Sequence, residues 1–94
     1  MSKITANTVF EFEKIASMRS VGDGAVILLA NSGQLFTCNE TTETILRDMN
    51  EPRAISDMVA KLCEEFEISS SEAEADVIEI AENLLEEGIL RIVS

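Results

Sequence analysis

The chain lacks the side chains on which most active sites depend. It contains no histidine, tyrosine or tryptophan, and its seven lysines and arginines stand beside eighteen aspartates and glutamates. Acid–base catalysis would therefore fall to carboxylates, which here occupy helical positions that face solvent. No glycine-rich segment is followed by the lysine that a phosphate-binding loop needs. We therefore expect a protein that is not an enzyme.

Cations and aromatic rings are also scarce, which argues against nucleic acid as a partner. The net charge of −11 repels phosphate backbones, and the few basic residues are scattered along the chain. Four phenylalanines are the only aromatic residues, too few to suggest a surface for base stacking.

The two cysteines, Cys38 and Cys63, are too few for a zinc site in a chain without histidine, so we expect no metal and no cofactor. We expect reduced core residues, with a disulfide between them as the alternative. The longest apolar run, residues 25–30, is far shorter than the ~20 residues that cross a bilayer. Residues 1–24 lack the apolar core of a signal peptide. We expect a cytoplasmic, soluble protein without membrane contact.

Four extended segments precede the helices. Residues 1–7 have no periodicity and are predicted to be disordered, and residues 8–94 to form one domain. Alternation and turn residues predict strands over 8–12, 15–21, 25–30 and 34–38. Glycine and asparagine between the last three segments suit tight turns, because both residues adopt positive φ cheaply. These turns predict an antiparallel sheet.

Three helical patterns follow the strands. Asn39 caps a helix from Glu40 whose apolar stripe runs to Met49, and Pro52 is expected to end it after about three turns. A second stripe runs from Ile55 to Phe66 and places Cys63 on its buried face.

The third helix is expected to begin at Ser69, which forms a capping box with Glu72. It is expected to end before Gly88, because helices commonly end at a glycine with a left-handed backbone conformation. Residues 89–93 are a short apolar tail that either returns as an extended edge or packs on the core. The inventory is α+β: a three-stranded antiparallel sheet followed by three helices, which is winged helix-turn-helix-like.

A winged helix commonly binds DNA through its last helix, but the charge here contradicts that role. Residues 63–90 contain ten acidic side chains and no basic one. Nothing on this helix could neutralise a phosphate, although exposed acids often serve only solubility. A protein or peptide is the better partner.

Several segments resemble the PqqD-like family, also called RiPP recognition elements. They are GAVILL at 24–29, SGQLF at 32–36, CNET at 38–41, EADV at 74–77 and GIL at 88–90. The resemblance implies a non-catalytic peptide chaperone that binds the leader segment of a ribosomally synthesised precursor peptide by strand addition. It would present that peptide to a modifying enzyme, such as a radical-SAM enzyme. Ala30 and the pair Ile45-Leu46 depart from the family pattern, which suggests a pathway other than pyrroloquinoline quinone synthesis.

The resemblance also implies where the peptide lies, along the third strand of the sheet and in a groove between that strand and the third helix. We expect Phe36 and Cys38 to face the core, and the acidic helix suggests a peptide that carries Lys or Arg. The implied peptide-binding residues are Gln34, Leu35, Phe36, Thr37, Cys38, Asp76, Val77, Glu79, Ile80, Asn83 and Leu84.

Other readings of the sequence stay open. The main alternative is a winged-helix module that bridges two proteins with no precursor peptide involved. An acyl carrier is disfavoured, since Ile55-Ser56-Asp57 does not match the Asp-Ser-Leu that bears its prosthetic arm. The chain could be a monomer or a strand-swapped dimer, with the N-terminal twenty residues as the swapped element.

Overall fold

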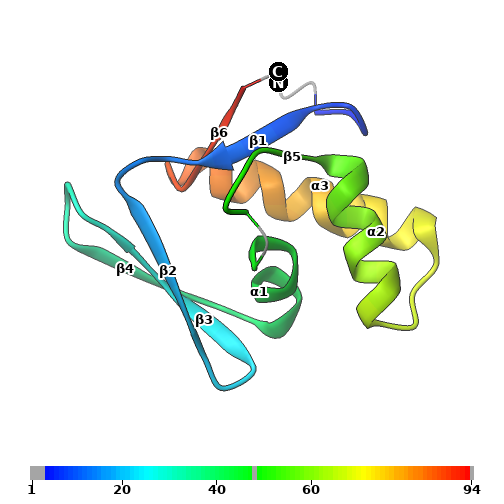
Figure 1. The fold of residues 1–94 in the computed structure, drawn as a ribbon, viewed down its shortest axis with the longest axis horizontal. Helices are drawn as coiled ribbons and strands as arrows, with labels where there is room; N and C mark the ends of the chain where they lie inside the picture. The colour runs from blue at the N-terminus through cyan, green and yellow to red at the C-terminus, as the bar shows by residue number, and fades with distance from the viewer. Residues whose placement is uncertain (1–3, 48, 94) are drawn as a thin grey trace.

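Two small antiparallel sheets and three helices form the chain in a computed structural model that describes residues 4–47 and 49–93 (Figure 1). In chain order the elements are β1 (Val9–Phe12), β2 (Ala16–Val21), β3 (Gly24–Leu29), β4 (Gln34–Cys38), α1 (Glu40–Leu46), β5 (Arg53–Ala54), α2 (Ile55–Glu65), α3 (Ser70–Glu86) and β6 (Leu90–Ile92). The predicted α+β fold, with a three-stranded antiparallel sheet and three helices, is confirmed.

The larger sheet has the order β2-β3-β4, and its register places Ile27 of β3 opposite Phe36 of β4. Successive side chains of a strand point to opposite faces. Ala25, Ile27 and Leu29 are buried, so the sheet has an inner face that packs on α1 and an outer face that carries Leu28. Figure 1 shows this sheet reaching away from α2 and α3, with no element over its outer side.

The smaller sheet has the order β5-β1-β6, and the sequence did not predict it. Phe10 pairs with Arg53 on one side and with Ile92 on the other. The segment 8–12 contains a strand as expected, β1. It pairs with β5 and with the apolar tail, β6, and not with a strand of the larger sheet. Phe10 and Leu90 are both buried in the core, which this sheet joins through the contacts of β6 with α3 and of β5 with α2.

A single hydrophobic core joins the two sheets to the helices. The largest side chains in it are fully buried and come from elements throughout the chain. They include Phe10, Ile27, Leu46, Ile55, Met58, Leu62, Val77, Ile89 and Leu90. In the part of the chain that the structure describes, no helix combines the length and the apolar character needed to cross a membrane.

Two details of the helices differ from expectation. α1 ends at Leu46, two turns after it starts, and Met49 lies in a turn outside it although its side chain is buried. The apolar stripe therefore predicted the burial of Met49 correctly, but it predicted a longer helix than the one observed. Cys63 is exposed rather than buried, because Ile55, Met58 and Leu62 already fill the inner face of α2 and the next residue points about 100° away. Cys38 and Cys63 are both free thiols.

The predicted caps at the starts of α1 and α3 and the predicted glycine after α3 are in place. The Asn39 side chain accepts a hydrogen bond from the Thr42 N–H at 3.0 Å, and Ser69 Oγ accepts one from the Glu72 N–H at 3.3 Å. Gly88 has a φ of +80°, the left-handed conformation expected after α3.

The beginning of the described chain contacts the start of α2. The Ala6 carbonyl accepts a hydrogen bond from the Ser56 N–H at 3.0 Å. Ile4 packs against the core. Of the segment 1–7 that was expected to be disordered, residues 1–3 lie outside the described residues.

A buried carboxylate ties the larger sheet to α1. Glu43 lies on the inner side of α1 with 5% of its surface exposed, and it accepts a hydrogen bond from the Ser20 hydroxyl of β2 at 2.8 Å. Arg47 donates to both Glu43 oxygens, at 2.8 and 3.1 Å. The hydrogen bonds from Arg47 and Ser20 hold the pKa of the Glu43 carboxyl below its ordinary value of 4.5, although burial opposes them.

This lowered pKa predicts a specific loss of stability in acid. Because the folded protein holds Glu43 ionised below pH 4.5, its contribution is present above that pH and disappears as the pH falls through the lower, folded value. Glu43→Gln should lower the free energy of unfolding by about 1 kcal/mol at pH 7 and by less in acid. Urea unfolding from pH 3 to pH 7 measures this, with Ser20→Ala expected to give a smaller change of the same sign. If the free energies of unfolding of the Glu43→Gln variant and the unchanged protein depend on pH in the same way, the prediction is wrong.

Gly24 is required by the close approach of β3 to the end of β4. A Cβ atom at this position would collide with the backbone carbonyl oxygen of Cys38, which cannot move without breaking the pairing. Gly24→Ala should therefore destabilise the protein by about 2–3 kcal/mol, as overpacking does. Gly22→Ala is the control, since Gly22 has a φ of +61° with open space around it and should cost only about 1 kcal/mol. Thermal unfolding that ranks the two variants the other way would refute this role of Gly24.

Candidate functional site

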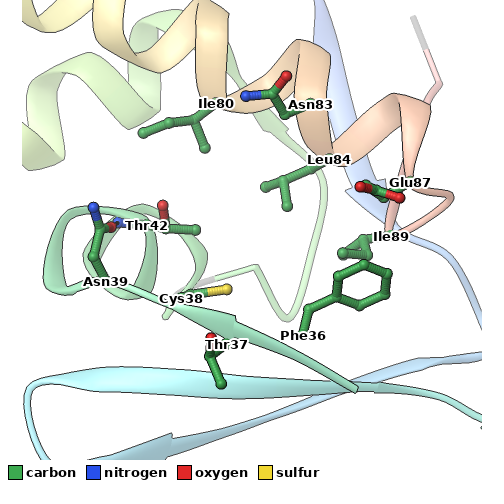
Figure 2. A pocket seen from close by; sticks show the side chains of 10 residues that line it. All are labelled: Phe36, Thr37, Cys38, Asn39, Thr42, Ile80, Asn83, Leu84, Glu87 and Ile89. Carbon is green, nitrogen blue, oxygen red and sulfur yellow. Dashed lines mark hydrogen bonds between the residues drawn. The ribbon is translucent and has the colours of Figure 1, made fainter. Parts of the chain in front are cut away.

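A groove of about 390 Å³ lies between β4 and the C-terminal half of α3 (Figure 2). Its walls come from β4, the start of α1, one face of α3 and the chain just after α3. The lining residues are Phe36, Thr37, Cys38, Asn39, Thr42, Ile80, Asn83, Leu84, Glu87 and Ile89.

One wall of the groove is a sheet edge. β4 pairs with β3 on one side only, so alternate N–H and C=O groups on its other side have no strand partner among the described residues. Such an edge binds any extended backbone that reaches it. The groove therefore offers main-chain hydrogen bonding along the wall that β4 forms.

The floor of the groove is apolar. Figure 2 shows Phe36 and Cys38 pointing toward Ile80 and Leu84, whereas Thr37 points to the other side of β4. Phe36, Cys38 and Ile80 are partly buried against the core, as expected for the first two. A side chain entering from solvent would meet carbon and sulfur atoms here.

The rim of the groove is polar and carries little charge. Asn83 and Glu87 are exposed on α3 and at its C-terminal end. Glu87 is the one charged side chain in the lining, and no lysine or arginine lines the groove. The site suits an uncharged, extended chain segment with a cation allowed at one end.

Cys38 places a thiol in the lining of the groove. Partial burial raises the pKa of its thiol above the ordinary value of 9.0. The thiol is therefore a weak nucleophile at neutral pH, since the thiolate is the reactive form. Within the described residues, no three His, Cys, Asp or Glu side chains come together in a way that could hold a metal ion.

The structure brings together about half of the residues that the sequence analysis proposed. Phe36, Thr37, Cys38, Ile80, Asn83 and Leu84 all line the groove. Gln34 and Leu35 belong to β4 but lie outside the lining, and Leu35 stands on the outer face of the sheet. Asp76 and Glu79 are exposed on α3 and are not among the residues that line the groove. Val77 is fully buried and has no surface to offer a ligand.

Four lining residues were missed. Asn39 and Thr42 begin α1 immediately after β4, and Glu87 and Ile89 flank Gly88. Helical spacing was a usable signal for Glu87, which lies seven residues after Ile80 and therefore on the same face of the helix. Ile89 enters only because the chain folds back after α3.

An unpaired strand edge beside an apolar groove, on a small α+β domain, defines a class of proteins that bind extended peptides. The family model of coenzyme PQQ synthesis protein D (PqqD) matches residues 24–90, and the chain belongs to this family. None of the curated proteins matches the chain significantly in sequence.

Two solved structures share the fold. One is described as TbiB1 in complex with the TbiA(beta) leader peptide, with a TM-score of 0.80, 17% identity, and coverage of 89% of this chain and 98% of that one. The other is described as lasso peptide synthetase B1 complexed with the leader peptide, with a TM-score of 0.75, 24% identity, and coverage of 87% and 96%. At these identities the likeness establishes the fold.

The different surroundings of the two thiols predict different reactivity. Cys38 should react with iodoacetamide more slowly than Cys63 at pH 8, because its pKa is raised and its surface is partly covered, whereas Cys63 is exposed. Mass spectrometry measures the alkylation rate of Cys63 in the Cys38→Ser variant and that of Cys38 in the Cys63→Ser variant. Equal rates for the two thiols would show that the groove does not shield Cys38.

Proposed function

We propose that this chain is a non-catalytic peptide chaperone that binds the leader segment of a ribosomally synthesised precursor peptide and presents it to a modifying enzyme. The observation that carries the proposal is the unpaired edge of β4 along an apolar groove, in a chain of the PqqD family. It is supported by the two proteins of the same fold, which are each described in complex with a leader peptide.

Binding would proceed by strand addition. The peptide backbone would pair with β4 and make the larger sheet four-stranded, and alternate side chains would turn into the groove. Burying one aliphatic side chain against Phe36, Ile80 and Leu84 would contribute about 1.5–3 kcal/mol. Main-chain pairing supplies affinity for any extended segment, so the shape of the groove would supply the selection.

The modifying enzyme is a separate partner in this proposal, for example a radical-SAM enzyme, and the chain would act in the cytoplasm without chemistry of its own. The bridging module, the other reading of the sequence, needs no free strand edge. It predicts that the chain does not bind a short extended peptide by itself.

The test is an amide chemical-shift titration of the labelled protein with the leader of a short peptide encoded beside it. We expect shifts concentrated on residues 34–38 and on the face of α3 that carries Ile80, together with slower alkylation of Cys38 but not of Cys63. Ile80→Asp should weaken binding at least about tenfold, because it puts a charge in the groove.

Ile78→Asp is the matched control, since Ile78 is equally part of α3, is also partly buried against the core, and lies outside the groove lining. It should destabilise the protein to a similar degree while leaving the peptide affinity unchanged. Equal loss of binding in both variants, or an absence of shifts with several adjacent leaders and an intact fold, would favour the bridging module.

A further inference from the structure

The outer face of the larger sheet carries an exposed apolar surface with a single charge. Strand alternation places Ser17, Arg19 and Val21 of β2 on it, beside Val26 and Leu28 of β3 and Leu35 and Thr37 of β4. Leu35, Val21 and Leu28 are 66%, 57% and 40% exposed. All of these residues except Thr37, together with Met18, line a hollow of about 420 Å³ that shares no lining residue with the groove. Contiguous apolar surface of this kind marks interaction sites.

Arg19 is unusual for an arginine in so acidic a chain. The other three arginines pair with carboxylates, in Arg47–Glu43, Arg53–Glu51 and Arg91–Glu11, whereas Arg19 forms no ion pair with the described residues. The outer face carries no carboxylate that could pair with it. A partner that covered this face without a counter-charge would leave the guanidinium buried and unpaired, at a large cost.

The charge pattern decides which occupant fits. A second copy of the chain would bring the same face, which has no carboxylate, and another net charge of −11. It could not neutralise Arg19. A partner surface that fits this face is apolar with a carboxylate near its centre. Arginine is enriched among the few residues that contribute most of the binding energy of protein interfaces.

We propose that this outer face docks the enzyme that modifies the captured peptide, through an acidic side chain ringed by apolar ones on that enzyme. The assignment of the partner rests on the proposed function. A peptide added to β4 would extend the same sheet beyond Leu35, and its outward side chains would continue the outer face. An enzyme docked on this face therefore lies against the bound peptide, while the acidic surface of α3 is on the other side of the sheet.

The test measures two affinities of the full chain, one for the leader and one for the purified peptide-modifying enzyme encoded beside it. Arg19→Glu should weaken enzyme binding at least about tenfold, and Leu28→Ser by several-fold, with leader binding unchanged. Lys14→Glu is the control, because it makes the same charge change at an exposed residue of the turn before β2, off this face. Ile80→Asp should show the opposite pattern, losing the leader and keeping the enzyme.

The outcomes separate the two proposals. If Arg19→Glu and Lys14→Glu bind the enzyme equally well, or if that enzyme does not bind the chain, the docking face is refuted while leader binding is unaffected. If sedimentation shows a dimer that Leu28→Ser dissociates, a second copy occupies the face and the proposal is also wrong. If the enzyme binds through Arg19 but the leader never binds, docking stands and the peptide-chaperone function fails.

Discussion

The antiparallel pairing of β3 with β4 is the constraint on which the rest of the structure depends. By setting Ile27 opposite Phe36, it turns Phe36 and Cys38 toward the helices and leaves Leu28 and Leu35 facing solvent. A slip of one residue would reverse both faces. Because β4 has no second neighbouring strand among the described residues, the same pairing also leaves an open edge beside the groove. Gly24 lets the two strands approach closely at their end.

The charges of the chain divide its surface into regions with different uses. α3 and the chain just before it are strongly acidic, the groove lining carries only Glu87, and the outer face of the larger sheet carries only Arg19. The acids on α3 disfavour contact with a phosphate backbone or with the same acidic surface of another copy, because like charges repel. They leave two surfaces of low charge, the groove and the outer face. Two nearly uncharged surfaces that meet at β4 suit a protein that would hold a peptide for a second protein.

The strength of the sequence evidence differed from element to element. Helix caps and tight turns were predicted well, because Asn39, Ser69 and Gly88 act through their own backbone and immediate neighbours. The burial of Met49 was also predicted, but not that α1 stops before it. Cys63 was placed wrongly, since a stripe of apolar residues does not say how wide the buried face is once Met58 and Leu62 have filled it. The pairing of β1 with β6 depends on residues about eighty positions apart, which no local pattern reports.

The sequence by itself determined the element types, the acidic character of the last helix and the identity of the strand that ends at Cys38. These properties depend on side-chain periodicity, turn chemistry and composition, all of which are local. Only the tertiary structure decided that Glu87 and Ile89 join Phe36 around one groove, that Val77 is fully buried, and that Arg19 lies among exposed apolar residues with no ion pair to the described residues. Each of these depends on how distant elements are placed in space, and packing of the whole core, rather than any one segment, sets that placement.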